Sequence, residues 1–229
     1  DGIIYVLLTG IAWRHLPREL GCGSGVTCWR RLNAWQQAGV WSGMHQVILK
    51  RLRKTGVLNL YRAIVDSSSV RAVKGGNHWA EPHGSREKGS KHHLLVDAGG
   101  IPLVVGLSGA NVPDVLTLEY LVSNLPHIGG RRGKPAHKPN RLHADKGYAS
   151  KKNRRFLVKI GVKCRIARKG IDSAEHLGRH RWVVERTIAW FHRFKRLRTR
   201  YERNPETHMA FMLLAAALIC WRQVTGKGL

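Results

Sequence analysis

The sequence predicts an α/β protein in which helices flank a mixed sheet and a small helical region precedes it. Two apolar runs on either side of the Gly99-Gly100 pair are typical of a β-hairpin, with the glycines in the tight turn. Short apolar runs elsewhere alternate with segments of helical spacing, as in α/β domains. The predicted strands are residues 62–65, 92–96, 101–107, 141–144 and 163–167.

Residues 1–55 form the predicted N-terminal helical region. A second helix begins near Ser24, and Gly39 separates it from a third. A helix, a short turn and a basic helix indicate a helix-turn-helix, a motif that places one helix in a DNA groove. Trp29 and Trp35 of the second helix could be core residues or contact bases; we expect them to be buried, because large aromatic side chains pack well in a small helical unit.

Residues 60–229 form the predicted α/β domain. The segment from Lys74 to Lys91 is rich in Gly, His, Lys and Arg, which indicates a basic surface loop. Apolar residues at helical spacing predict several helices, and the last of them is apolar on most sides, which indicates a buried helix. These helices are residues 113–125, 150–160, 179–200 and 206–222.

The charge of the chain is strongly unbalanced. There are 40 Lys and Arg against 14 Asp and Glu, a formal net charge of +26. Such a surface attracts a polyanion, and double-stranded DNA is the expected partner. A membrane surface is the alternative, but the longest apolar stretch, Met209 to Trp221, is shorter than the roughly 18 residues that span a bilayer. We therefore expect no membrane association.

The cysteines and histidines show no convincing metal-binding spacing. The four cysteines include no C-x-x-C pair, which argues against a structural zinc site and fits the reducing cytoplasm. No secretory signal is visible. Because the chain begins at Asp1 rather than at a methionine, we expect the natural start to lie upstream.

Three carboxylates stand out in this basic chain: Asp66, Asp145 and Glu185. Asp66 and Asp145 each end a predicted strand, where sites form in open α/β sheets, and Glu185 lies inside the long basic helix. Phosphoryl transfer on nucleic acid commonly uses two divalent ions about 4 Å apart. Mg²⁺ prefers carboxylate oxygens, water and substrate phosphate as ligands. Three acids from separate elements are sufficient for such a site, with Asp66 placed to bridge both ions.

Helix geometry places Glu185 on a polar face. At about 100° per residue, it falls nearly opposite an apolar stripe, and Arg181, His192 and Arg196 share its side. The apolar stripe consists of Val183, Thr187, Trp190, Phe194 and Leu197. A phosphate backbone could lie against the polar face. An Arg181–Glu185 ion pair at i, i+4, worth a few tenths of a kcal/mol, explains the acid equally well, so both interpretations stay open.

Other acids have ordinary structural explanations. Asp97 precedes the Gly99-Gly100 turn, and we expect it to be a turn residue. Asp114 follows Pro113 and is placed to start a helix. Asp172 falls in a predicted loop before the long basic helix.

Four motifs follow one another along the chain. They are Ile64-Val65-Asp66-Ser67-Ser68, Gly84-Ser85-Arg86-x-x-Gly89-Ser90-Lys91, Ala144-Asp145-Lys146-Gly147-Tyr148 and Arg181-Trp182-Val183-Val184-Glu185-Arg186-Thr187. In this order they resemble bacterial insertion-sequence transposases of the DDE class, in the branch related to insertion sequences four and five. Residues 2–50 are similar to that branch's N-terminal DNA-binding region, so the resemblance covers nearly the whole chain.

The resemblance implies an RNase H-like fold and dependence on Mg²⁺ or Mn²⁺. It also implies Asp66, Asp145 and Glu185 as the catalytic, metal-binding triad, and a homodimer on DNA, associated with the nucleoid of a bacterial cytoplasm. Basic residues in or near the motifs are the predicted DNA contacts. These are Arg30, Arg31, Arg86, Lys88, Lys91, Lys146, Arg181, His192, Lys195 and Arg196.

The glutamate motif departs from the family pattern at two positions. Related families carry Tyr-x2-Arg-x3-Glu-x6-Lys, and the Arg and Glu of this signature are present here. Gly178 stands at the Tyr position and His192 at the Lys position. Lys195 or Arg196, one turn further along the helix, could replace that lysine.

The function expected from these observations is DNA transposition. Water attacks the phosphodiester at the element end, and the freed 3′-OH then attacks target DNA. One alternative is a non-catalytic helix-turn-helix DNA-binding protein derived from such an element, which needs no acids. Another is a nuclease of the same fold without strand transfer. Metal binding that depends on all three carboxylates argues against the non-catalytic DNA-binding protein. A strand-transfer assay distinguishes the nuclease from a transposase.

The net charge also predicts a steep salt dependence of DNA binding. Neutralising about six or more phosphates gives a slope of log K against log salt near −5 or steeper, because counterions are released. Fluorescence anisotropy of a labelled duplex, titrated at several salt concentrations, measures this slope. An association constant that does not change with salt contradicts the prediction.

Overall fold

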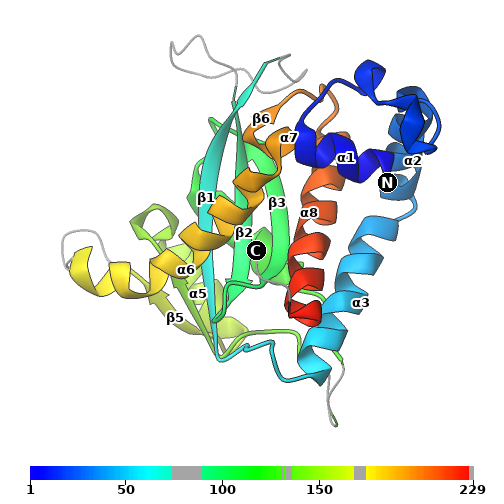
Figure 1. The fold of residues 1–229 in the computed structure, drawn as a ribbon. Helices are drawn as coiled ribbons and strands as arrows, with labels where there is room; N and C mark the ends of the chain where they lie inside the picture. The colour runs from blue at the N-terminus through cyan, green and yellow to red at the C-terminus, as the bar shows by residue number, and fades with distance from the viewer. Residues whose placement is uncertain (74–88, 130–131, 133–135, 168–173, 227–229) are drawn as a thin grey trace.

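The computed structural model describes residues 1–73, 89–129, 132, 136–167 and 174–226, and a mixed sheet forms its centre (Figure 1). The strands are β1 (Arg62–Ala72), β2 (Gly89–Asp97), β3 (Pro102–Gly109), β4 (Arg141–Ala144), β5 (Lys163–Ile166) and β6 (Thr199–Arg200). Their order is β3-β2-β1-β4-β5, and β6 pairs with β1. β2 runs antiparallel to both neighbours, whereas the other pairings are parallel. The fold is therefore RNase H-like, and the predicted fold class is confirmed.

Helices precede, connect and follow the strands. The α-helices are α1 (Gly2–Thr9), α2 (Gly25–Gln37), α3 (Val40–Lys54), α4 (Leu118–Ser123), α5 (Lys151–Lys159), α6 (Ala174–Arg193), α7 (Lys195–Arg198) and α8 (Pro205–Thr225). Short 3-10 helices are η1 (Trp13–His15), η2 (Arg18–Leu20), η3 (Asp114–Leu116) and η4 (Lys146–Tyr148).

Local sequence signals explain several of these boundaries. α2 begins after Ser24, whose hydroxyl oxygen accepts the backbone N–H of Thr27 at 3.1 Å and so caps the helix. Gly39 separates α2 from α3 with a φ of 69°, a conformation that glycine adopts without steric cost. The predicted hairpin of β2 and β3 is confirmed, with Gly100 at a φ of 88° in its turn.

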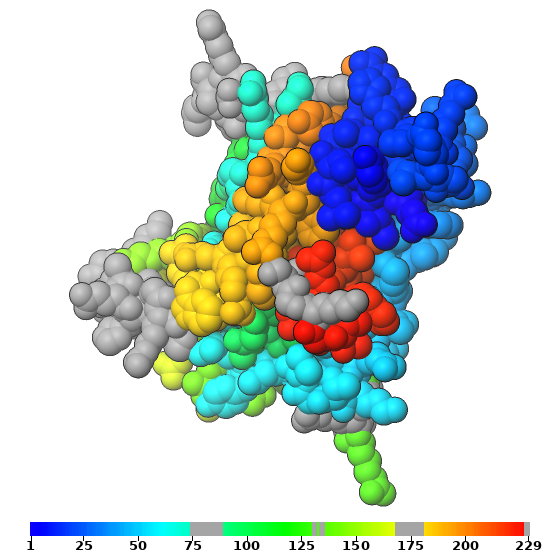
Figure 2. All heavy atoms as spheres, viewed as in Figure 1, coloured from blue at the N-terminus to red at the C-terminus, as the bar shows by residue number. Residues whose placement is uncertain are grey.

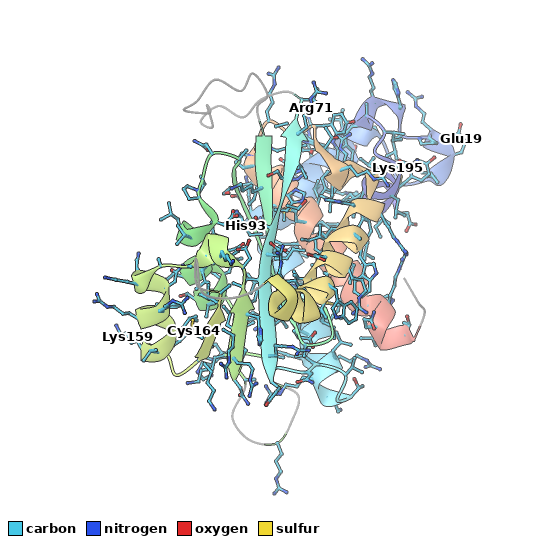
Figure 3. All side chains as sticks on the ribbon, turned by 90° about the vertical axis from the view of Figure 1, so that its left-hand side faces the viewer. Glu19, Arg71, His93, Lys159, Cys164 and Lys195 are labelled. Carbon is cyan, nitrogen blue, oxygen red and sulfur yellow. The ribbon has the colours of Figure 1, made fainter. Side chains whose placement is uncertain are left out.

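Helices cover both faces of the sheet, and the alternation of side chains along β1 separates two cores. Ala63 and Val65 pack in one core with α4 and α5, whereas Ile64 packs in the other with α6 and α8. Figure 3 views the sheet from its β5 side, with α5 and α6 on opposite sides of it. Successive residues of one strand therefore serve different layers.

The N-terminal helices share a core with the rest of the chain. Ile3, Val6 and Leu7 of α1 lie in the same apolar cluster as Phe211 of α8, and Trp13 stacks on Phe211 with ring centroids 5.7 Å apart. In the space-filling view the blue N-terminal region lies directly against the orange and red segments (Figure 2). The two predicted regions, residues 1–55 and 60–229, therefore share one apolar core on this side of the sheet.

A buried polar network fixes the end of α1 to the C-terminal part of the chain. Arg196 donates from Nε to Glu202 at 2.8 Å and from a terminal nitrogen to two carbonyl oxygens just after α1. Glu202 also lies 3.3 Å from His208, which is hydrogen-bonded to His92 at 2.8 Å. The prediction that Arg196 contacts DNA is corrected by this arrangement. Its side chain is inside the protein, where an unpaired charge would be costly.

α8 is the central helix of this core. It has 21 residues and a mean hydropathy of 1.3 over its most apolar window, so by length and composition alone it could cross a membrane. The helix is longer than the apolar stretch from Met209 to Trp221 because it continues through more polar residues at both ends. Within the protein, 61% of that window is buried against other elements, as expected for a core helix.

Two predicted element boundaries are wrong. β1 does not end at Asp66 but runs on to Ala72, because its antiparallel pairing with β2 continues as far as Arg71. The helix predicted from residue 179 to 200 ends at Arg193, where Phe194 adopts an extended backbone. The buried Phe194 side chain turns the chain at this point, and α7 and β6 follow.

The prediction that Trp29 and Trp35 are buried is also wrong. Trp29 is 43% exposed and Trp35 is 42% exposed, because α2 buries Cys28 and Leu32 instead. The aromatic residue buried at this point is Trp41 of α3, whose ring contacts Trp35 edge-on.

Buried histidines predict a loss of stability in acid. Burial lowers the pKa of His45 from the usual value to about 4, although its hydrogen bond to the Pro102 carbonyl opposes this shift. The unfolded chain therefore binds more protons below pH ~6.5, and His45 alone lowers the free energy of unfolding by about 2 kcal/mol at pH ~5. Well above pH ~6.5 His45 is neutral in both states and the loss of stability is absent. As the pH falls the loss grows, and it levels off below the folded-state pKa of about 4.

Urea denaturation between pH ~7 and ~5 tests this effect. His45→Gln can still donate to Pro102 and does not titrate, so the mean slope of unfolding free energy against pH over this range should fall by about 1 kcal/mol per pH unit. His15→Gln, at an exposed position, is the matched control and should leave the slope unchanged. Equal slopes for His45→Gln and the unsubstituted protein contradict the prediction.

Candidate active site

The parallel pairing of β1 with β4 brings Asp66 and Asp145 together. The last aligned pair of this ladder is Val65 with Ala144, and each acid is the next residue along its strand direction. Neighbouring strands lie about 4.8 Å apart, so the two carboxylates start from adjacent backbone positions. Asp145 thus follows a strand end as predicted, whereas Asp66 marks the end of one ladder inside a longer strand.

Backbone N–H groups orient both carboxylates. Asp66 is 7% exposed, and its Oδ1 accepts the N–H of Ser67 at 2.9 Å. Asp145 precedes η4, and its Oδ1 accepts the N–H of Gly147 at 2.9 Å. Charge-assisted hydrogen bonds of this kind fix a carboxylate before any ligand arrives.

Glu185 comes from α6, which crosses β1. Val183, Val184 and Thr187 are buried on the side of α6 that faces the sheet, and the Glu185 side chain is 56% exposed. The predicted apolar stripe is thus largely confirmed, with Thr187 as its one polar member. Exposure leaves the Glu185 carboxylate able to turn toward the sheet or toward solvent.

Two residues next to Glu185 anchor α6 to the turn between β2 and β3. Arg186 donates to the Gly99 carbonyl at 2.6 Å, and the Thr187 hydroxyl donates to the Gly100 carbonyl at 2.7 Å. A side chain at Gly100 would meet Thr187 Oγ1 at 2.9 Å, so the close approach depends on glycine. Sequence reasoning placed Thr187 in the core, but only its partner across the fold reveals this anchoring role.

Asp97 holds the turn in the shape that this anchor needs. Its buried carboxylate accepts backbone N–H groups from Asn59, Gly99 and Ile101, each at 2.8 Å. Burial raises the pKa of Asp97, and these hydrogen bonds to the charged form oppose the shift. The prediction that Asp97 is a turn residue is confirmed.

Arg181 links the acid on the sheet to the acid on the helix. One of its terminal nitrogens lies 3.3 Å from Asp66 Oδ2 and 3.6 Å from Glu185 Oε1. The two carboxyl oxygens are therefore at most about 7 Å apart, within the roughly 4–8 Å that shared metal ions allow. The i, i+4 ion pair exists, and Glu185 also faces Asp66, so the two interpretations of this acid are compatible.

The electrostatics of the site call for a cation. Burial raises the pKa of Asp66; the Ser67 N–H and the Arg181 guanidinium oppose the shift, and the neighbouring Asp145 adds to it. Like charges this close destabilise one another unless positive charge lies between them. Arg181 supplies that charge in this structure.

The donor set suits a hard divalent cation. Asp66, Asp145 and Glu185 offer only oxygen atoms, the ligands that Mg²⁺ and Mn²⁺ prefer. Within the residues that the structure describes, no three metal-ligating side chains stand at ligand distance from one point, because Arg181 lies between the acids. The chemistry of the three carboxylates therefore fits a hard divalent cation, and in this structure the Arg181 guanidinium lies between two of them.

The predicted DNA contacts differ widely in exposure. Arg30 and Arg31 are exposed on α2, Lys195 is exposed on α7, and Lys146 is half-buried beside Asp145. Arg86 and Lys88 lie outside the described residues, as do Asp172 and nearly all of the predicted basic loop.

Two further predicted contacts are engaged inside the protein. Lys91 is ion-paired with Asp114 at 3.1 Å and donates to a backbone carbonyl, so its charge is largely satisfied. His192, half-buried, lies 3.4 Å from the Ser68 hydroxyl. Asp114 begins η3, as predicted for a helix-start residue.

Family models and known proteins resemble this chain along most of its length. A model described as the transposase DDE domain matches residues 59–220, and one for transposases of the IS4/5 family matches residues 1–45. A candidate transposase of insertion sequence element IS402 from Burkholderia cepacia is 44% identical over 160 residues, 70% of this chain and 74% of that protein.

Two other proteins are more distantly similar to this chain. The transposase of insertion sequence element IS1106 from Neisseria meningitidis serogroup B is 26% identical, over 59% of this chain and 49% of that protein. Among solved structures, the catalytic core domain of BIV integrase aligns with a TM-score of 0.39 and 12% identity. That alignment covers 70% of this chain and 84% of the integrase chain.

The anchor between α6 and the hairpin turn predicts a measurable loss of stability. Thr187→Val removes the hydroxyl and leaves the buried Gly100 carbonyl without this donor, so the free energy of unfolding should fall by about 1–3 kcal/mol. Thr187→Ser keeps the hydroxyl and is the matched control. Urea denaturation compares the two variants, and a loss in Thr187→Val no larger than that in Thr187→Ser contradicts a stabilising hydrogen bond from the hydroxyl.

Proposed function

The chain belongs to the DDE transposase family, and from that premise we propose that Asp66, Asp145 and Glu185 are the acids with which it cleaves insertion-element ends. One observation carries the proposal. Arg181 lies within ion-pair distance of Asp66 and Glu185, while Asp145 stands beside Asp66 across the β1–β4 ladder. Acids from three separate elements thus lie near one another on one face of the sheet of a basic protein, which supports two-metal phosphoryl transfer.

Divalent metal use belongs to the DDE family, and Mg²⁺ or Mn²⁺ held by these three carboxylates is the form that we propose here. When bound, the ions would activate the attacking oxygen and neutralise the charge on the leaving oxygen. The all-oxygen donor set supports the proposal, as does the need for positive charge between Asp66 and Glu185.

The remaining residues of the site orient the acids and the DNA. The N–H groups of Ser67 and Gly147 hold Asp66 and Asp145 in fixed directions. Lys146 lies between Asp145 and Gly147 in the chain and is placed to attract a phosphate. Arg181, once separated from the acids, has a guanidinium free to pair with a phosphate oxygen.

The reaction proceeds by two displacements at phosphorus. Water attacks the phosphodiester at the element end, which breaks one P–O bond and leaves a free 3′-OH on the element and a 5′-phosphate on the flanking strand. The 3′-OH then attacks a phosphodiester of the target, forms the new joint and releases a target 3′-OH. We also propose that the protein acts as a homodimer on DNA in the bacterial cytoplasm, since two element ends are joined together.

Asp66→Asn tests the acid assignment. The amide keeps the size of the side chain but removes its charge, so strand cleavage of an element-end duplex in Mg²⁺ or Mn²⁺ should be abolished. The dissociation constant for the same duplex, measured without divalent metal, should change by less than about twofold, because the change is remote from most phosphate contacts. Glu19→Gln, at an exposed position in η2 of the N-terminal region, is the control and should retain cleavage (Figure 3).

The same assay separates the other functions. Normal cleavage by Asp66→Asn means that the acids are not the catalytic groups. Binding without any metal-dependent cleavage by the unsubstituted protein identifies a non-catalytic DNA-binding protein. Cleavage without joined products in the presence of target DNA identifies a nuclease.

A further inference from the structure

One face of β4 and β5 is cationic where a covered sheet would be apolar. Leu142 and Ala144 of β4, together with Ile166 of β5, point into the core beneath α4 and α5. The alternate residues point to the other face, the side on which α6 lies. Those residues are Arg141, His143, Lys163 and Arg165.

The strand register aligns these cations with the acids. Arg141 is paired with Lys163 on β5, and the row two residues further along joins His143 to Arg165. Asp145 follows the end of β4, two residues after His143, and its extended backbone continues the same alternation of faces. At about 3.3 Å per residue, the cations lie roughly 7 and 13 Å before the acids along the strand direction. The face therefore leads directly to the catalytic site.

The cations on this face are available to a partner. Lys163 and Arg165 are exposed on β5, the edge strand of the sheet. Arg141 is half-buried, stacks over the Tyr61 ring at 4.4 Å and donates to its hydroxyl at 2.6 Å, which holds the guanidinium in place. Among the residues that the structure describes, none of these three cations forms an ion pair with a carboxylate.

The surrounding sequence contains almost nothing that could neutralise this charge. Between Tyr120 and Ile171 the chain has fifteen Lys and Arg and a single acid, Asp145. That acid belongs to the catalytic site. These three cations stand at alternate positions of two strands and have no acidic partner among the described residues. Such a row is complementary in charge to a partner with evenly spaced negative charges.

We propose that Arg141, Lys163 and Arg165 form a phosphate track that holds the backbone of the DNA duplex beside the scissile phosphate. The proposal rests on the transposase function above and specifies where the substrate lies. One DNA strand carries a phosphate every 3.4 Å or so along the helix axis, so the distance of about 13 Å from the far end of the track to the acids corresponds to roughly four phosphates. The track is distinct from α2, whose Arg30 and Arg31 are the predicted contacts of the N-terminal region.

A charge-matched pair of double variants tests the track. Lys163→Gln/Arg165→Gln removes two cations from it, and Lys151→Gln/Lys159→Gln removes two exposed cations from α5, on the other side of the sheet (Figure 3). The probe is a labelled duplex of about 30 base pairs, titrated by anisotropy over a range of salt concentrations. We expect the track variant to lower the log–log salt slope by about 2 and the α5 variant to leave it nearly unchanged. Lys163→Arg/Arg165→Lys keeps the charge and should keep the slope.

The outcomes separate this inference from the proposed function. Equal slope losses in the two double variants show an effect of net charge alone and overturn the track. Tighter binding of an acidic polypeptide than of the duplex, abolished by the track variant, overturns DNA as its ligand. Asp66→Asn should lose cleavage yet keep the full salt slope. The track can therefore be wrong while the catalytic assignment is right, and the catalytic assignment can be wrong while the track is right.

Discussion

The end of the β1–β4 ladder is the constraint on which the site depends. Parallel pairing stops at Val65 and Ala144, and the next residues, Asp66 and Asp145, are carboxylates at adjacent backbone positions. Two such groups at the rim of an apolar core repel each other, and burial already raises the pKa of Asp66. The arrangement is stable only with positive charge close by. Arg181 supplies it in this structure, and a divalent ion supplies it in the proposed reaction.

The third acid depends on contacts that are distant in sequence. α6 is fixed to the sheet by the bonds from Arg186 and Thr187 to the hairpin turn, and Asp97 holds that turn in shape. Behind α6, the buried network centred on Glu202 joins α1, α7 and α8. The position of Glu185 is therefore set by the packing of the whole α6 side of the sheet. Its own side chain is 56% exposed and is not held by this packing.

The sequence predicted the elements near the acids better than the placement of single side chains. The hairpin, the short strands and most helices follow from local signals: glycine pairs, apolar runs and caps. Arg196 could not be recognised as buried, because the helix predicted to contain it ends at Arg193 without a proline or glycine, and its partner Glu202 follows α7 and β6. Trp29 and Trp35 are exposed because α1 and α8 take up the other side of α2, and helical periodicity does not show which neighbours a helix acquires.

By itself, the sequence determined the fold class, the large positive charge and three acids in motifs that resemble the DDE family, because charge balance and short motifs are properties of the linear chain. Only the tertiary structure decided that Arg181 lies between Asp66 and Glu185, and that Arg141, Lys163 and Arg165 share the face on which the acids stand. Strand register and helix crossing set these distances. Both arise from pairing and packing between segments far apart in the chain, which no local pattern encodes.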